Sequence, residues 1–243
     1  MPERGLGRLR EWDEQNLEYK LPRKAVPPGV NYRYWWTPEI VNQGSKPYCV
    51  GYSGYTWLRC GPIYNKPVLT PDELYFLAQD NDEWPGRDYD GSSGLGLMKG
   101  LKDKGYVNEY RWALDANTAL AWVLTTGPVL AGTNWYSGMS DPDKYGYIHP
   151  KGDMEGGHEW CITGASRTKI NPDKSVGAFR MTNSWGKDWA DGGRSWITKN
   201  EFDALLHDQG DCVTPTEILV APGKLLKAPL KVASAEWKVV NVA

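Results

Sequence analysis

The pattern of apolar and polar positions along the chain changes near Gly127. Before that residue, mixed apolar and polar runs are bounded by helix start and stop signals; after it, short β-prone runs are separated by Gly, Pro, Asp and Asn. We therefore expect helices over 50–59, 71–79, 95–104 and 115–126, and a short late helix within 201–211. Strands are expected in the runs PVLAGTNWY, HEWCITGAS, GAFRMTNSW and RSWITKN. A helical first half followed by a β-rich second half predicts an α+β fold with two lobes that meet at a cleft.

Particular residues set the expected helix boundaries. Thr70 is a good cap, and Pro71 with two acidic residues after it suits the first helical turn. Ser92 or Ser93 is the candidate cap of the next helix, and Gly105 is its expected end.

The chain divides into three expected segments. Residues 1–26 are polar and predict an extended arm, residues 27–221 form the folded domain, and residues 222–243 form either a final strand or a second arm. Within the domain, the helical lobe is expected at about 40–126 and the β lobe at about 127–221.

Charge and hydropathy argue against several classes of protein. The 243-residue chain has a net charge of −2, with acidic and basic residues mixed along it, so it lacks the basic footprint of a protein that binds nucleic acid or an anionic membrane. No apolar run is long enough to span a bilayer, and the charged start MPERGLGRLREWDEQ lacks the apolar stretch of a signal peptide. We expect a cytoplasmic location, or a virion if the gene is phage-encoded, without a nucleic-acid or membrane partner.

The four cysteines follow neither the spacing of a disulfide framework nor that of a zinc site. The acidic loop DNDEWPGRDYD lacks the regular alternation of a calcium loop, and we expect no metal or other cofactor. Cys60, Cys161 and Cys212 are expected to be small buried hydrophobes. Cys49 needs a different explanation.

Cys49 stands where the loop NQGSKPY gives way to the expected helix over 50–59. A cysteine is nucleophilic as a thiolate, which the positive end of a helix and a neighbouring imidazolium both stabilise. Of the three histidines, His158 follows a Gly-Gly pair that permits close approach, whereas His149 and His207 are expected at the surface.

Two further residues would complete a catalytic constellation. Asn183 ends a β-prone run, and its amide oxygen can accept from the ring of His158 and hold the productive tautomer. Trp185 can shield that bond from water. Gln43, six residues before Cys49, can supply a side-chain donor to a tetrahedral oxyanion, with the Cys49 backbone N–H as the other donor.

Three blocks of the sequence carry a resemblance to a known family. QGSKPYC resembles the QGxxxxC block of papain and the cathepsins, GGHEWCITG resembles their histidine block, and NSWGKDWADGGRSWI resembles their asparagine block. The blocks occur in the family order, over roughly 27–220. The chain thus resembles papain-like cysteine peptidases, in a form without a signal segment that is closer to bacterial or bacteriophage proteins than to lysosomal ones.

This resemblance implies a two-lobed papain-like fold and hydrolysis of peptide bonds in a polypeptide substrate by an endopeptidase. Cys49, His158 and Asn183 would form the triad, with Gln43 beside them, and the reaction would pass through a thioester acyl-enzyme. By position, Gly91, Ser92 and Ser93 would line the substrate groove, with Gly132 and Glu159 near the side-chain pocket and Trp185 close by.

The sequence also departs from the family pattern. Lys46 replaces a structural cysteine, Val50 replaces a tryptophan, and Glu159 replaces the alanine after the catalytic histidine. A carboxylate at Glu159 could select basic or polar side chains or raise the pKa of the Cys49–His158 pair. The arm is much shorter than the family's inhibitory pro-segments, so we expect no folded self-inhibitor, although the arm could occupy a cleft or dock to a partner.

Two other functions stay open. The fold could serve as a catalytically silent structural or binding component of a larger assembly such as a phage virion, with residues 1–30 and 222–243 as docking segments. A related acyl transfer, such as isopeptide cleavage or transfer to an amine, would need the same triad.

Overall fold

The computed structural model describes residues 4–64, 69–221 and 224–226. The helices are η1 (Glu14–Leu17, a 3₁₀ turn), α1 (Cys49–Arg59), α2 (Pro71–Gln79), α3 (Gly94–Asp103), α4 (Ala116–Thr125), α5 (Ser137–Ser140) and α6 (Lys199–His207). The strands are β1 (Tyr32–Tyr34), β2 (Val107–Trp112), β3 (Val129–Tyr136), β4 (Met154–Ile170), β5 (Val176–Thr182), β6 (Arg194–Thr198), β7 (Asp211–Ala221) and β8 (Lys224–Leu226).

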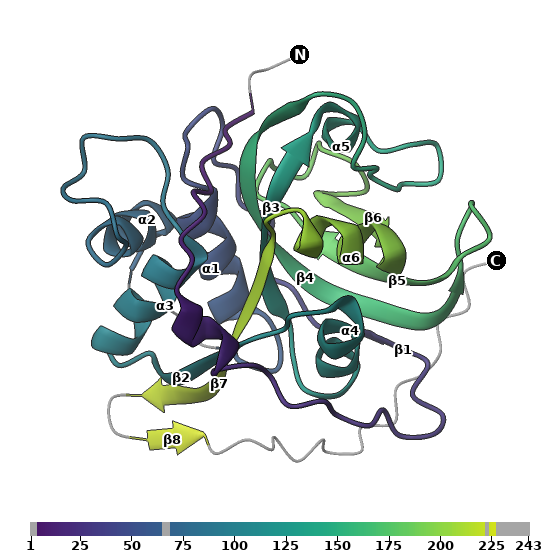
Figure 1. The fold of residues 1–243 in the computed structure, drawn as a ribbon, viewed down its shortest axis with the longest axis horizontal. Helices are drawn as coiled ribbons and strands as arrows, with labels where there is room; N and C mark the ends of the chain where they lie inside the picture. Colours follow the sequence, from purple (N-terminus) through teal and green to yellow (C-terminus); the bar gives the residue numbers. More distant parts are fainter. Residues whose placement is uncertain (1–3, 65–68, 222–223, 227–243) are drawn as a thin grey trace.

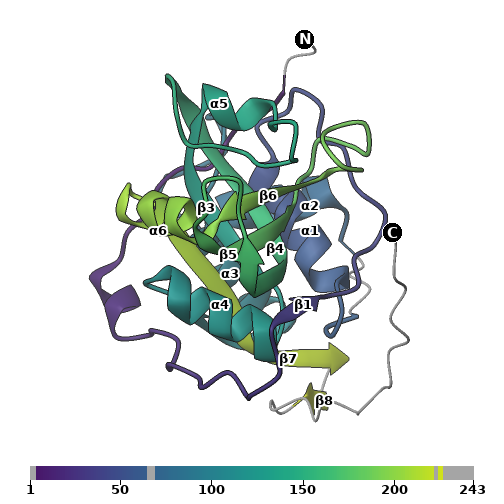
Figure 2. The ribbon, with the colours of Figure 1, turned by 90° about the vertical axis from the view of Figure 1, so that its right-hand side faces the viewer.

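The strands form one antiparallel sheet in the order β2-β7-β3-β4-β5-β6, with β1 added to β4 and β8 added to β7. Successive residues of β3 face opposite sides, as a strand requires. Leu130 packs into a core with α1–α3, whereas Val129 and Ala131 pack into a second core with α4 and α6. Figures 1 and 2 show these helix groups on either side of the sheet. The expected α+β fold is confirmed.

The expected helices are present, and their caps explain where they begin. Thr70 and Glu73 form a reciprocal capping box at the start of α2. Ser93 accepts from the Gly96 amide at 2.8 Å to begin α3, and Asp115 accepts from the Thr118 amide at 2.8 Å to begin α4. The sequence did not predict β1, β2 or β7.

The expected C-terminal arm, residues 222–243, lies outside the described residues except for the backbone of β8. Within the described ranges, no helix is both long enough and apolar enough to cross a membrane.

The described part of the expected N-terminal arm, residues 4–26, lies along the rest of the chain, and apart from the 3₁₀ turn η1 it contains no helix. Figure 1 shows it in purple, passing between α1–α3 on one side and β3 and β4 on the other. Residues 4–11, named here the arm segment, bond to both sides: the Gly7 amide donates to the Gly157 carbonyl at 2.9 Å, and the Gly7 carbonyl accepts from the Ser92 amide at 2.9 Å. The arm segment is therefore held between the helices and the sheet.

Candidate active site

Cys49 is the first residue of α1, and its side chain is fully buried. Tyr48, before it, makes no side-chain cap, so the positive end of the helix is directed at the thiol. The Glu159 amide on β4 donates to Cys49 Sγ at 3.4 Å. The sulfur therefore lies against the strand position next to His158.

His158 is held in one orientation by three neighbours. Its Nε2 donates to Asn183 Oδ1 at 2.8 Å, and the same oxygen accepts from the Ser184 amide at 2.8 Å. The imidazole stacks on Trp185 and meets the edge of Trp135, each with ring centroids 4.8 Å apart. Donation by Nε2 leaves Nδ1 as the basic nitrogen, as a general base needs.

The side-chain amide of Gln43 already binds a carbonyl group. Its Nε2 donates to the Gly5 carbonyl at 3.1 Å and to the Lys46 carbonyl at 2.7 Å, while its Oε1 accepts from the Ser184 hydroxyl. The amide nitrogen is thereby turned toward the arm segment, where a peptide carbonyl can reach it.

The arm segment fills the site at close range. Trp185 Nε1 donates to the Gly5 carbonyl at 3.2 Å, and the Arg4 guanidinium lies 5.3 Å from the centroid of Trp185. A β-carbon on Gly7 would collide with the backbone of Pro47. The sequence predicted no folded self-inhibitor but allowed the arm to occupy a cleft, and the short extended arm segment does lie against these residues.

Burial favours the neutral forms of Cys49 and His158. It raises the pKa of the Cys49 thiol to about 12, against the lowering effect of the Glu159 and Val50 amides, and the nearby Glu159 carboxyl raises it further. Burial lowers the pKa of His158 to about 4. His158 Nδ1 has no hydrogen-bond partner among the described residues, so Cys49 and His158 are not bonded to each other. This state holds a thiol and a neutral imidazole.

The other residues expected to bind substrate all lie near the arm segment. Ser92 pairs with Gly7 and Leu9 through its backbone, and Ser93 donates its hydroxyl to Glu11. A β-carbon on Gly91 would lie 2.6 Å from the Gly7 carbonyl oxygen. Gly132 on β3 pairs in register with Glu159 on β4.

The remaining histidines and cysteines lie apart from this site. His149 is partly exposed and bonds to Glu201 at 2.7 Å, and His207 is exposed at the end of α6. Cys60, Cys161 and Cys212 are free and buried, as expected.

Three residues near the site were not expected from the sequence: Arg8, Trp135 and Asp211. Trp135 lies in the expected strand PVLAGTNWY, but only the packing of β3 on β4 brings it to His158. Asp211 begins β7, and its carboxylate binds Arg8 of the arm segment.

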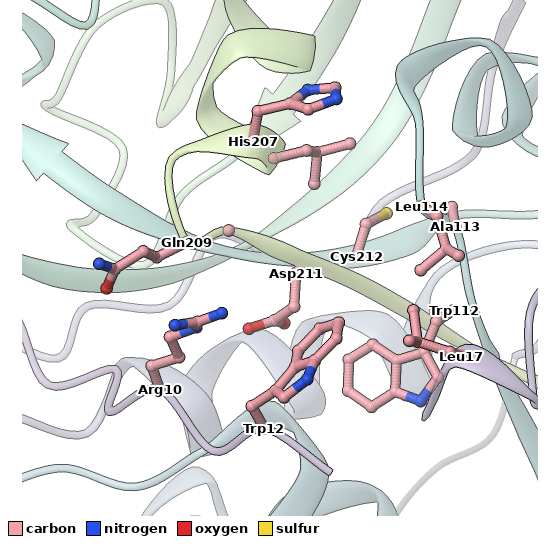
Figure 3. A pocket seen from close by; sticks show the side chains of 12 residues that line it. Arg10, Trp12, Leu17, Trp112, Ala113, Leu114, His207, Gln209, Asp211 and Cys212 are labelled. Carbon is pink, nitrogen blue, oxygen red and sulfur yellow. The ribbon is translucent and has the colours of Figure 1, made fainter. Parts of the chain in front are cut away.

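A cavity of about 260 Å³ lies beside Asp211. Figure 3 shows Arg10 and Trp12 of the arm at its lower edge, with the ring of Trp112 beside that of Trp12 and with Asp211 and Cys212 above them. Because the arm supplies one wall, this hollow would widen on its departure.

Comparison with solved structures identifies the type of fold. No protein-family model and no curated protein matches the chain. Solved structures do match. Xylellain, a cysteine protease from Xylella fastidiosa, is 15% identical with a TM-score of 0.62, over 88% of this chain and 97% of its own. The fold is papain-like. Digestive procathepsin L 3 from the larval midgut of Tenebrio molitor is 14% identical with a TM-score of 0.60, over 88% and 76%. The cysteine protease and lectin-like domains of Cwp84, a surface layer associated protein from Clostridium difficile, are 18% identical with a TM-score of 0.56, over 85% and 61%.

The pKa of His158 leads to a prediction about acid stability. The unfolded chain binds a proton on this residue near pH 6.5, whereas the folded chain does so only near pH 4. The contribution of His158 to the free energy of unfolding is thus fully present above pH 6.5. It is lost as the pH falls to 4, and the loss is at most about 3 kcal/mol. Urea unfolding from pH 7 to 4 should show a shallower loss in His158→Gln than in the wild type. His207→Gln, at an exposed ring, should keep the wild-type slope; equal slopes in all three proteins would contradict this prediction.

Proposed function

We propose that the chain is a latent papain-like cysteine peptidase, with its own arm segment as the plug of the site. The supporting observation is the bond of 2.8 Å from His158 Nε2 to Asn183 Oδ1, made beside a cysteine at the start of a helix. A histidine with one nitrogen fixed by an amide oxygen and the other left basic is arranged to take the proton of a nearby thiol.

The proposed reaction is acyl transfer in two halves. With a substrate in place of the arm segment, the Cys49 proton moves to His158 Nδ1, and the thiolate attacks the peptide carbonyl carbon. Gln43 Nε2 and the Cys49 amide donate to the oxyanion. His158 gives its proton to the leaving amine as the C–N bond breaks, which leaves a thioester. Water then attacks the thioester with His158 as base, and the acid and free thiol are released.

The Gly5 carbonyl supports the role proposed for Gln43. It accepts, at 3.1 Å, from the donor that would receive a substrate oxygen. The segment also forms a parallel bridge from Arg8 to Ser92. We infer that the arm segment lies as a bound peptide would, beside a neutral thiol and a neutral imidazole.

Labelling tests this function. A peptide that carries an electrophile in place of its scissile bond should add once to the full chain at pH 7, at Cys49, as read by mass spectrometry of proteolytic fragments. The other three cysteines are internal controls, because all are buried thiols away from the proposed donors. Cys49→Ala should take up no label.

A second function, a catalytically silent binding component, is favoured by the absence of a Cys49–His158 bond within the described residues. Under that alternative, Cys49 would stay unlabelled even in a variant whose arm segment has been displaced. Assembly into a virion, a cytoplasmic location and a bacterial or phage origin remain predictions from the sequence. Isopeptide cleavage or transfer to an amine would give the same label and would differ in the products.

A further inference from the structure

Three residues stand in one row across the sheet, on adjacent strands. Gly132 on β3 pairs in register with Asp211 on β7 and with Glu159 on β4. Directly paired residues of an antiparallel sheet point to the same face. Because the central residue has no side chain, the row consists of two carboxyl groups with a gap between them.

The gap holds the guanidinium group of Arg8. Its Nη2 donates to Asp211 Oδ2 and to the Gln209 carbonyl, the latter at 2.9 Å, and only 2% of the Arg8 side chain is exposed. A β-carbon on Gly132 would lie 2.5 to 3.0 Å from Glu159 Oε2, Arg8 Nε and Asp211 Oδ1. Any larger residue at Gly132 would therefore fill the space that the arginine uses.

The end of α6 supplies the carbonyl in this pocket. Gln209 has a left-handed conformation with φ of 62°, and the Gly210 amide donates to the Leu205 carbonyl at 3.0 Å. This arrangement closes the helix as a Schellman motif and turns the chain into β7. The Gln209 carbonyl and the Asp211 carboxylate thus come from one rigid turn and bind the same nitrogen.

Arg8 uses only part of what the pocket offers. Glu159 is fully buried, yet neither of its carboxyl oxygens has a hydrogen-bond partner among the described residues, and the same is true of Asp211 Oδ1 and Arg8 Nε. A buried polar atom without a partner is costly, so an occupant that satisfied these atoms would bind better than Arg8 does.

The charges balance for one cation. Burial and the nearby Asp211 carboxylate raise the pKa of Glu159 well above its usual value, which favours the neutral acid. Asp211 is then the counterion of a single positive group, and Glu159 can donate or accept a hydrogen bond.

We propose that Asp211, Glu159 and Gly132 form the specificity pocket of the enzyme, and that it takes an arginine side chain of the polypeptide substrate, with Arg8 as its occupant in the latent state. The role of this pocket in binding substrate rests on the proposed peptidase function. Its preference for a guanidinium group can be tested without catalysis. An arginine fits better than a lysine, because its planar fork binds the Asp211 carboxylate and the Gln209 carbonyl together and still has N–H groups left for Glu159.

The binding test uses the full-length Arg8→Ala protein, in which the cation is removed but the pocket remains. N-ethylguanidinium, the missing end of the side chain, should raise its melting temperature at millimolar concentration. N-ethylurea, a neutral molecule of the same shape, should give no comparable rise. Neither compound should stabilise the wild type, whose pocket is full. Equal responses to the two compounds, or no response to either, would overturn the proposal.

The paired variant Arg8→Ala/Asp211→Asn isolates the counterion. Loss of the carboxylate should remove the response to N-ethylguanidinium, whereas Arg8→Ala/Asp191→Asn should keep it. Asp191 is a matched control because the same charge is lost at a side chain that is 75% exposed and pairs with Arg180 outside the pocket. A response that survived Asp211→Asn would contradict the role of Asp211.

The substrate test uses the full chain with Gly7→Ala, which is expected to release the arm segment. Fluorogenic peptides with arginine should be cleaved at least about tenfold better, in kcat/KM, than leucine peptides at one of the two positions before the scissile bond. Asp211→Asn should lower that ratio at least about tenfold. Equal cleavage of both peptide series would overturn the pocket assignment alone. No cleavage of any peptide, together with a positive binding test, would overturn the peptidase proposal and keep the pocket.

Discussion

Gly7→Ala is expected to expel the arm segment and raise the rate at which a peptide electrophile labels Cys49 by about 10- to 100-fold. The β-carbon would collide with the Pro47 carbonyl group, and the backbone on the other side is fixed by bonds from Gly7 to Ser92 and Gly157. Overpacking of this kind costs about 1–3 kcal/mol, and each 1.4 kcal/mol changes an equilibrium about tenfold. The folded domain should be retained, since the collision is relieved by movement of the arm.

Gly127→Ala is the matched control. Its added β-carbon would meet nothing closer than 3.6 Å, which is ordinary contact. Hydrogen exchange at the Leu9 and Ser92 amides gives a second measurement, because both donate across the interface between arm and site. Exchange and labelling rates equal to those of Gly127→Ala would show that the arm segment does not limit access.

Cys49→Ala, placed in the Gly7→Ala protein, is expected to lower the hydrolysis of an unstructured polypeptide by roughly four to six orders of magnitude. Loss of the nucleophile leaves only binding and the oxyanion donors to act on the substrate. Cys60→Ala in the same protein is the control, because it removes another buried thiol that the mechanism does not use. Hydrolysis that persisted in Cys49→Ala would assign the chemistry to another group, and equal losses in both variants would indicate damage to the fold.

Much of the fold follows from local signals in the sequence. Thr70 caps the helix that it was expected to cap, Ser93 is the cap of the two serines that were candidates, and Asp115 stands at the expected helix start, because capping depends on a few consecutive residues. Strands β2 and β7 were not expected. These two strands pair with each other, with Val107 opposite Ile218. No local sequence pattern predicts a pairing strand more than a hundred residues away.

The proposed catalytic residues were easier to predict than their surroundings. Cys49, His158 and Asn183 lie in blocks with distinctive neighbours, whereas the pocket row depends on which strands pair. The arm gave one usable signal, the alternation of Gly5 and Gly7, which puts both glycines on the same side of an extended chain. Each glycine packs against the backbone just before Cys49. This contact forms only when the chain folds, so the local sequence could not predict it.

The way the arm is anchored determines how tightly it needs to bind. Tyr19 and Leu21 bond to the backbone of Trp112 at 2.9 and 2.7 Å, so only a short tether separates a fixed point on β2 from the arm segment. A short tether gives a local concentration on the order of millimolar, and a contact of modest affinity can then keep the site filled. One cut in residues 12–18 would free the segment to diffuse away at ordinary protein concentrations. Because the arm segment is tethered, weak binding is enough to keep the site occupied. Once the tether is cut, the segment rebinds only at high concentration.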